Sequence, residues 1–168
     1  MAARKKTNEP DKTNVHEALR AALHAALGVM AHSAEDARKG AVHEENRSEG
    51  DKDMRATEQS YVARGQAMRT EQLAEDVARF ETITVRRFAP EAAVGITALI
   101  KVRIDEDERW FYLVAQGGGM ELDVEGHRVT VLTPSSPAGQ SLLGKFEGDE
   151  FELRAAGKVR VWEVLAVR

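Results

Sequence analysis

Hydrophobic positions follow a helical period through the first half of the chain. From Val15 onward, apolar residues recur at alternating spacings of three and four, which is the pattern of one stripe along a long helix. The stripe contains Val15, Leu19, Ala22, Leu23, Ala26, Leu27, Met30, Ala34, Ala37 and Ala41. Most of these side chains are small, which favours the close approach of a second helix. We expect Thr13 or Asn14 to cap the start of this first helix.

A polar stretch at residues 43–53 interrupts the helical pattern. It contains the turn-forming residues Asn46, Ser48 and Gly50 and ends with Asp51 and Asp53, either of which could cap a new helix. A second apolar stripe then follows at helical spacing, through Met54, Thr57, Tyr61, Gly65, Met68, Gln72, Leu73, Val77 and Phe80. Two long helices joined by a short polar turn predict an antiparallel hairpin, with residues 43–53 as its tip.

Past Ile83 the pattern changes to short runs of strand-forming residues. The expected strands are residues 95–104, 110–115, 129–133, 150–154 and 159–167, and one short helix is expected from Ala138 to Leu143. In the last strand, strict alternation would place Val159, Val161, Glu163, Leu165 and Val167 on one face and Arg160, Trp162, Val164 and Ala166 on the other. Antiparallel strands with one helix predict a compact domain of the α+β class.

Composition narrows the class of protein. The chain has 168 residues, a formal net charge of −4 and a pI of about 5.8, which argues against a general nucleic-acid binder. It has no cysteine, and this excludes disulfides, Cys-ligated zinc and thiol catalysis. No apolar run approaches the roughly 18 residues of a membrane span. Residues 1–13 are basic and lack the apolar core of a signal peptide, so we expect a flexible basic tail and a cytoplasmic protein.

One segment matches part of a nucleotide-binding motif. Gly139 to Lys145 reads G-x-x-x-x-G-K, the start of a phosphate-binding loop. In such a loop the next residue is Ser or Thr, because its hydroxyl ligates the Mg²⁺ of the nucleotide. Here that residue is Phe146, and Glu147-Gly148-Asp149 would bring negative charge toward the phosphates. The segment is therefore predicted to be a short helix and a turn that bind no nucleotide.

The hairpin tip is rich in carboxylates. Its acids are Glu44, Glu45, Glu49, Asp51 and Asp53, against Arg47 and Lys52, for a formal net charge of −3. One interpretation is a solvated turn with helix-capping acids. The other is that exposed carboxylates are offered to a divalent metal, since hard oxygen ligands suit Mg²⁺. Acids at the end of a hairpin cannot enclose an active site alone, so they would complete the site of a partner.

The strongest motif in the chain carries a resemblance to a known family. Ser136, Pro137, Gly139, Leu142, Leu143, Gly144, Lys145, Gly148 and Asp149 match the family pattern S-P-L-G-x-A-L-L-G-K-x-x-G-D, and Glu163-Val164-Leu165-Ala166-Val167 matches its closing E-V-L-x-V. Glu58-Gln59-Ser60-Tyr61 is similar to the family's E-Q-G-F. On these residues the chain resembles the bacterial Gre transcription elongation factors (GreA/GreB), over residues 14 to 168.

The resemblance implies a fold and a function. It implies an antiparallel coiled-coil hairpin over residues 14–82 and an FKBP-like antiparallel β-sheet domain over residues 83–168. That domain would dock on RNA polymerase at the rim of its secondary channel. The residues implied in docking are those of the motif, Ser136, Pro137, Gly139, Leu142, Leu143, Gly144 and Lys145.

The tip acids would enter the channel and help the polymerase to hydrolyse backtracked RNA. The resemblance implies that Glu45 and Glu49 share a Mg²⁺ ion with the polymerase active site, with Asp51 and Asp53 as alternatives. Counting back from Gln59 without gaps points to Glu45 and Ser48, and a one-residue insertion moves the second position to Glu49. The chain would then be no enzyme, would hold no cofactor of its own, and would act as a monomer that reaches the nascent RNA 3′ end only indirectly.

Two alternatives remain open. The family's G-D-L element is absent from the tip, because Gly50-Asp51 follows Glu49 rather than preceding the acids. This departure leaves room for a channel-binding regulator that does not stimulate cleavage. An FKBP-like prolyl isomerase is disfavoured, because the available aromatic residues, Trp110, Phe111, Tyr112, Phe146, Phe151 and Trp162, include several expected in strand cores.

Overall fold

A computed structural model describes residues 9–45, 53–155 and 157–168 of the chain. The chain divides into two compact units. The hairpin unit is Arg20–Thr82, and the sheet unit consists of the segment that ends at Leu19 together with Ile83–Arg168. Helix α1 begins in the sheet unit and continues into the hairpin unit.

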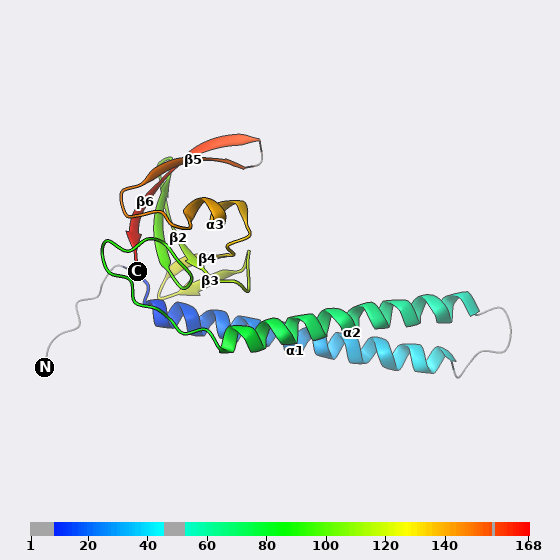
Figure 1. The fold of residues 1–168 in the computed structure, drawn as a ribbon. Coiled ribbons are helices and arrows are strands. Elements are labelled where there is room, and N and C mark those ends of the chain that lie inside the picture. Colours follow the sequence, from blue (N-terminus) through cyan, green and yellow to red (C-terminus); the bar gives the residue numbers. More distant parts are fainter. Residues whose placement is uncertain (1–8, 46–52, 156) are drawn as a thin grey trace, which may run out of the picture. The chain divides into compact units, whose positions relative to one another are not determined.

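Two long helices form the hairpin unit. They are α1 (Lys12–Glu45) and α2 (Asp53–Glu81), and Figure 1 shows them antiparallel and side by side. His24 Nε2 lies 2.7 Å from Glu81 Oε1, and Thr70 Oγ1 lies 3.4 Å from the Met30 carbonyl oxygen. As residue numbers increase along α1, the numbers of the facing residues in α2 decrease, so the two helices run in opposite directions. The hairpin predicted from the two apolar stripes is present.

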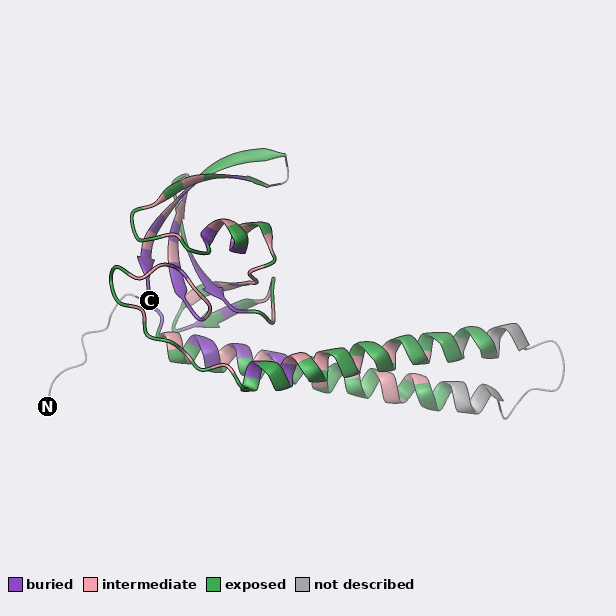
Figure 2. Cartoon of the chain, in the orientation of Figure 1, coloured by how far each residue is buried: buried purple, intermediate pink, exposed green. Residues whose placement is uncertain are grey.

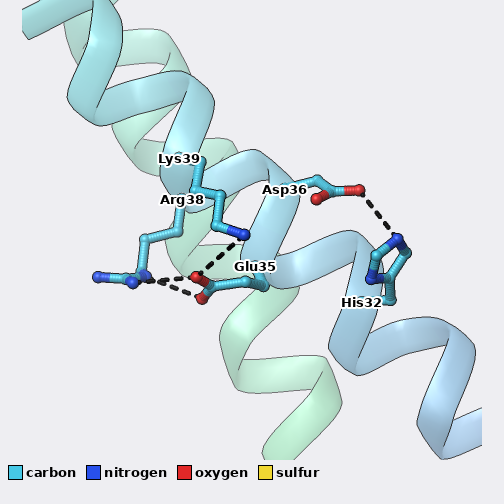
Figure 3. A network of polar contacts seen from close by, with 5 residues as sticks. All are labelled: His32, Glu35, Asp36, Arg38 and Lys39. Atoms are coloured by element: carbon cyan, nitrogen blue, oxygen red, sulfur yellow. Dashed lines mark hydrogen bonds and ion pairs between the residues drawn. The ribbon is translucent and has the colours of Figure 1, made fainter.

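Burial within the hairpin unit is uneven along its length. Leu23, Val77 and Phe80 are buried, whereas most other positions of α2 are exposed (Figure 2). Charged side chains on the surface of α1 pair with one another, as Figure 3 shows: Glu35 binds Arg38 and Lys39, and His32 contacts Asp36. The hydrogen bond from Arg38 holds the pKa of the Glu35 carboxyl below its usual value. Such exposed pairs add little to stability because solvent screens them.

The first helix is capped by a residue other than the two expected. Asp11 Oδ1 accepts hydrogen bonds from the backbone N–H groups of Thr13 at 2.8 Å and Asn14 at 3.3 Å. These are orphan donors of the first helical turn, so Asp11 is the cap, and Thr13 and Asn14 lie inside the helix. Glu125, from the turn between two strands, accepts from the Asp11 N–H at 2.9 Å and from Asn14 Nδ2 at 2.7 Å.

The sheet unit is built on a single six-stranded sheet. Its strands are β1 (Leu99–Ile104), β2 (Asp107–Leu113), β3 (Glu121–Val124), β4 (His127–Leu132), β5 (Glu150–Ala155) and β6 (Lys158–Val167), in the order β3-β4-β2-β1-β6-β5. The short helix is α3 (Pro137–Leu142). The α+β class expected from the sequence is confirmed.

The sheet is mixed rather than purely antiparallel. Four neighbouring pairs are antiparallel, but β2 and β4 pair in parallel, with Trp110 opposite Val129 and Leu113 opposite Leu132. The cause is β3, a strand that the sequence analysis did not predict. It forms a hairpin with β4 and takes the edge of the sheet, so that β4 lies against β2 in the same direction.

One face of the sheet carries the main hydrophobic core. This core contains Val94, Ala98, Ile100, Val102, Ile104, Phe111, Leu113, Leu142, Leu153, Trp162, Val164 and Val167. Within it the ring of Trp162 stacks on Phe111 with centroids 5.3 Å apart. Val164 and Val167 both belong to this core, although strict alternation would place them on opposite faces. The register between β1 and β6 shifts between Lys101 and Val102, and this irregularity corrects the predicted alternation.

The beginning of α1 packs within the sheet unit. Val15 and Leu19 are fully buried, and His16 Nδ1 lies 2.8 Å from the hydroxyl oxygen of Tyr112. Tyr112 alternates with the core residues Phe111 and Leu113 along β2, so it points to the face opposite the main core. Burial raises the pKa of the Tyr112 hydroxyl well above its usual value, and the group stays protonated at all ordinary pH values.

Tyr112→Phe tests the contribution of this buried hydrogen bond. We expect the free energy of unfolding to fall by about 1 kcal/mol or more, because the substitution removes a partner of a buried polar group. Urea unfolding followed by circular dichroism measures the change. Tyr61→Phe is the matched control, since Tyr61 is 70% exposed. Equal stabilities for the two variants would contradict a structural role of the His16–Tyr112 contact.

Candidate functional site

The segment from Ser136 to Asp149 begins with a capped helix. Ser136 Oγ accepts a hydrogen bond from the Gly139 N–H at 3.1 Å and donates one to the Thr133 carbonyl at 2.7 Å. Pro137 occupies the first turn, where its missing N–H costs nothing and its fixed φ suits a helix. Ser136 is therefore the N-cap of α3, and the Ser-Pro pair of the motif specifies where this helix starts.

Gly139 is required by the close approach of the backbone. A Cβ atom at this position would lie 1.9 Å from the Thr133 carbonyl oxygen and 2.8 Å from its carbonyl carbon. No real side chain tolerates such distances from backbone atoms. Only glycine lets the first turn of α3 lie directly on the chain that leads into it.

The backbone donors of the G-x-x-x-x-G-K stretch are already occupied. The Gly139 N–H binds Ser136 Oγ, the Gly144 N–H donates to the Val94 carbonyl at 2.9 Å, and the Lys145 N–H donates to the Leu142 carbonyl at 3.0 Å. A phosphate loop needs such N–H groups free to surround the phosphates. The geometry agrees with the rejection of a nucleotide site on the ground of Phe146.

A tight turn after α3 presents two apolar side chains to solvent. Gly144 and Gly148 have φ angles of +80° and +93°, which glycine adopts without strain. Asp149 Oδ2 accepts the Phe146 N–H at 2.9 Å and closes the turn. Leu143 is 46% exposed and Phe146 is 48% exposed. We call residues 143–149 the docking turn, after the docking that the sequence resemblance implies for this segment.

The residues predicted for docking divide into two groups. Leu142 is fully buried in the main core, and Gly139 and Ser136 serve the packing and capping of α3. Pro137, Leu143 and Gly144 are exposed, and Lys145 is half-buried with its Nζ 5.5 Å from the centroid of the Phe151 ring. The sequence analysis did not count Phe146 as a docking residue. The sequence does contain a signal for this residue. Phe146 stands between Gly144 and Gly148, and an aromatic side chain in a glycine-flanked turn is a candidate for exposure to solvent.

The tip acids fall at the limit of the described residues. Glu45 is the last residue of α1 and Asp53 is the first residue of α2. Their side chains, and all of Glu49 and Asp51, lie outside the part of the chain that the structure describes. Within that described part, no three His, Asp or Glu side chains gather in a way that could hold a metal ion. The assignment of the tip acids stays a prediction.

A concave surface lies on the sheet unit. It encloses about 580 Å³, and its lining includes Lys101, Trp110 and His127. The charged groups that line it pair with one another: Lys101 Nζ with Glu108 at 2.6 Å, Arg109 with Asp107 at 3.7 Å, and Arg128 with Glu121 at 3.8 Å. The groove thus offers no unbalanced charge that would select one class of ligand.

Most aromatic residues of the sheet unit are buried or half-buried. Trp110, Phe111, Tyr112 and Trp162 are each exposed by less than a tenth, and Phe151 packs against Trp162 with centroids 5.9 Å apart. Of these five residues, Trp110 alone lines the concave surface described above. In the described residues, no helix has the length and apolar character that crossing a membrane demands.

Sequence comparison finds relatives with a common name. The transcription elongation factor GreA of Chelativorans sp. is 33% identical to this chain over 101 residues, and GreA of Brucella canis is 31% identical over 100 residues. Each match covers 60% of this chain, and the chain spans about 60% of the length of these curated relatives. No protein-family model matches the chain.

Solved structures of similar proteins superpose only loosely. GreA factor homolog 1 (Gfh1) of Thermus thermophilus is 14% identical with a TM-score of 0.38, over 89% of this chain and 94% of that chain. The transcription elongation factor GreA/GreB from Nitrosomonas europaea is 24% identical with a TM-score of 0.37, over 58% of this chain and 77% of that chain. These superpositions support no functional conclusion.

The sequence matches define a class: the chain is similar to transcription elongation factors of the GreA type. More particularly, both relatives carry the name GreA, and the likeness to each extends over about 100 residues.

Gly139→Ala tests the close contact that builds α3. We expect a loss of about 3 kcal/mol in the free energy of unfolding, because the new methyl group must displace the Thr133 backbone. The control is Gly65→Ala, a helical position with no atom within 4 Å of the added Cβ, which should be neutral or gain up to about 1 kcal/mol. Urea unfolding of both variants measures the difference. A tolerated Gly139→Ala substitution would contradict the packing described.

Proposed function

We propose that this protein is a Gre-type transcription elongation factor that binds RNA polymerase at its secondary channel. In this proposal the sheet unit docks on the polymerase and acids of the hairpin tip stimulate cleavage of backtracked RNA. The similarity to proteins named transcription elongation factor GreA supports the proposal. The protein would then be a factor that assists the active site of the polymerase rather than an enzyme with its own.

The docking turn is the observation that carries the proposal. It exposes Leu143 and Phe146, which are three residues apart in sequence, while Leu142 and Gly139 tie the same segment to the core. Exposed apolar side chains on a rigid support are typical of protein contacts, because their burial releases water without a large ordering cost. The turn is held by the Asp149–Phe146 hydrogen bond and by two left-handed glycines, so it is organised before any partner arrives.

The tip supplies the chemistry in this proposal. Glu45 and Glu49, with Asp51 and Asp53 as alternatives, offer carboxylate oxygens, which are the ligands that Mg²⁺ prefers. A Mg²⁺ ion shared with the polymerase would lower the pKa of a bound water and offset the charge of the reacting phosphate. The contribution of the chain is to bring these carboxylates to that site and to hold the water in place.

A second function is favoured by one observation on the tip. The family's Gly-Asp-Leu element is absent, and Gly50-Asp51 comes after Glu49. A tip whose acids stand at different sequence positions from those of the family could occupy the channel without placing a carboxylate at the Mg²⁺ ion of the polymerase. The protein would then regulate or inhibit the polymerase without stimulating cleavage.

Replacing the two tip acids tests the proposed chemistry. In a purified backtracked elongation complex with Mg²⁺, the unchanged protein should release short 3′ RNA fragments. Glu45→Ala with Glu49→Ala should lower the rate of release by about 100-fold, as expected when a group that positions a catalytic metal is lost. Quantification of labelled RNA on a denaturing gel measures the rate, and binding to the polymerase should not change.

Glu58→Ala with Glu71→Ala is the matched control, because it removes the same charge from two positions inside α2 rather than from the tip. Cleavage that survives the tip substitutions would refute the assignment of Glu45 and Glu49. If the unchanged protein binds the polymerase and yields no fragments, the regulatory function replaces the cleavage function.

Truncating the docking turn tests the proposed contact surface. Leu143→Ala with Phe146→Ala should weaken polymerase binding by roughly 10- to 100-fold, which is typical for the loss of two apolar anchors. Fluorescence anisotropy of labelled protein measures the dissociation constant. The control is Val159→Ala with Val161→Ala, since these valines are equally exposed at 48% and 49%. A greater loss for the valine pair would move the docking surface to β6.

A further inference from the structure

The hairpin unit carries a groove between its two helices that the proposed function does not use. The groove has a volume of about 560 Å³, and all the residues that line it belong to the hairpin unit. Five of them are alanines: Ala31 and Ala34 of α1, and Ala63, Ala67 and Ala74 of α2. Because these side chains are short, another helix can approach to an axial distance of about 8 Å, the lower end of helix packing. We call this surface the hairpin groove.

The polar groups on the floor and on the α1 edge of the hairpin groove are already satisfied. Thr70 lines the floor, and its Oγ1 donates a hydrogen bond to the Gln66 carbonyl at 2.9 Å. On the α1 edge, Glu35 pairs with Arg38 at 3.0 Å and with Lys39 at 3.7 Å, as Figure 3 shows. These residues therefore suit an apolar protein surface better than a polar small molecule.

The α2 edge of the hairpin groove carries two opposite charges without partners. Arg64 and Glu71 are both exposed, and within the described part of the chain neither forms an ion pair or a side-chain hydrogen bond. They stand seven positions apart on one side of α2, which is a separation of about 10.5 Å along the helix. The residues three and four positions from Arg64 are all uncharged, so α2 itself offers this guanidinium no partner.

This pair of charges is its own complement under a two-fold axis. When a second copy lays its α2 antiparallel along the hairpin groove, with the axis beside Ala67, Arg64 of each copy meets Glu71 of the other. We propose that the hairpin groove is a self-association site, in which two copies pack groove to groove and form two Arg64–Glu71 ion pairs between them. The alanines of one copy then cover those of the other.

The α1 edge agrees with the same two-fold axis. Thr70 contacts the Met30 carbonyl, and the lining of the groove places Glu35 and Arg38 beside residues 64–71 of α2. The axis therefore also brings Glu35 of each copy toward Arg38 of the other, and this contact is attractive. Complementary charges around an apolar contact fix its orientation and register.

The proposed dimer departs from the monomer that the sequence resemblance implies. It does not depend on the proposed function, because the association needs no RNA polymerase. The packing of alanines supplies close approach without a large apolar side chain, so we expect a reversible dimer rather than a permanent one.

Sedimentation equilibrium of the full-length protein tests the association. Measurements from about 1 to about 100 µM cover the affinities of small, transient interfaces. We expect a monomer–dimer equilibrium that shifts toward the dimer as concentration rises. High salt should weaken the dimer, because exposed ion pairs are screened. A chain that stays monomeric over the whole range would overturn the proposal, whatever other helix the groove might accept.

Charge reversal tests the geometry of the dimer. Arg64→Glu and Glu71→Arg each turn two attractive contacts into two repulsive ones, and each should weaken self-association by at least about tenfold. Mixed in equal amounts, the two variants should associate again, because positions 64 and 71 then carry opposite charges in both contacts. Arg69→Glu is the matched control: Arg69 is exposed on α2, lies outside the lining of the groove and, in the described residues, has no ion pair. It should leave the dissociation constant unchanged.

Three results of the variant series would also overturn the proposal. A dimer that survives both single reversals would lie on another surface of the chain. Two reversal variants that are folded by circular dichroism and stay separate when mixed would contradict the pairing of Arg64 with Glu71. An equal loss for Arg69→Glu would assign the effect to net charge rather than to the hairpin groove.

Discussion

The contact between Gly139 and the Thr133 carbonyl is the constraint on which the rest of the candidate docking surface depends. It presses the first turn of α3 onto the preceding backbone, where Ser136 caps the helix. That position directs Leu142 into the main core and leaves Leu143 on the outside one residue later. A helix that began one residue earlier or later would rotate by about 100°, and Ser141 or Leu143 would take the buried place of Leu142. The exposed turn therefore follows from a contact inside the domain.

The two units of the chain divide structural and chemical tasks differently. In the sheet unit, tightly packed residues hold a small exposed apolar surface in a defined conformation. In the hairpin unit, small alanines and few large buried side chains support two long helices, whose surface charges mostly pair with one another. The chemistry proposed for this unit belongs to acids at the ends of the two helices and in the segment that joins them. Such groups would act only when a partner completes the site.

Much of the architecture followed from periodicity, and the failures have specific physical causes. β3 was missed because it is only four residues long and half of them, Glu121 and Asp123, are charged. Without it the parallel pairing of β2 and β4 could not be foreseen. The cap at Asp11 was missed because Thr13 and Asn14 have the same capping chemistry, and only the backbone decides which residue lies one position before the first helical turn. The irregularity beside Lys101 was invisible in a sequence that alternates regularly.

The sequence by itself determined the α+β class, the helical hairpin and the likeness to Gre factors, because these depend on local spacing and on a contiguous motif. It also excluded a phosphate loop through one residue, Phe146. The tertiary structure decided which residues of the motif are packed and which are exposed, and it brought alanines of α1 and α2 together in one groove. Burial and electrostatic environment arise from residues that are distant in sequence, so no local pattern of side chains encodes them.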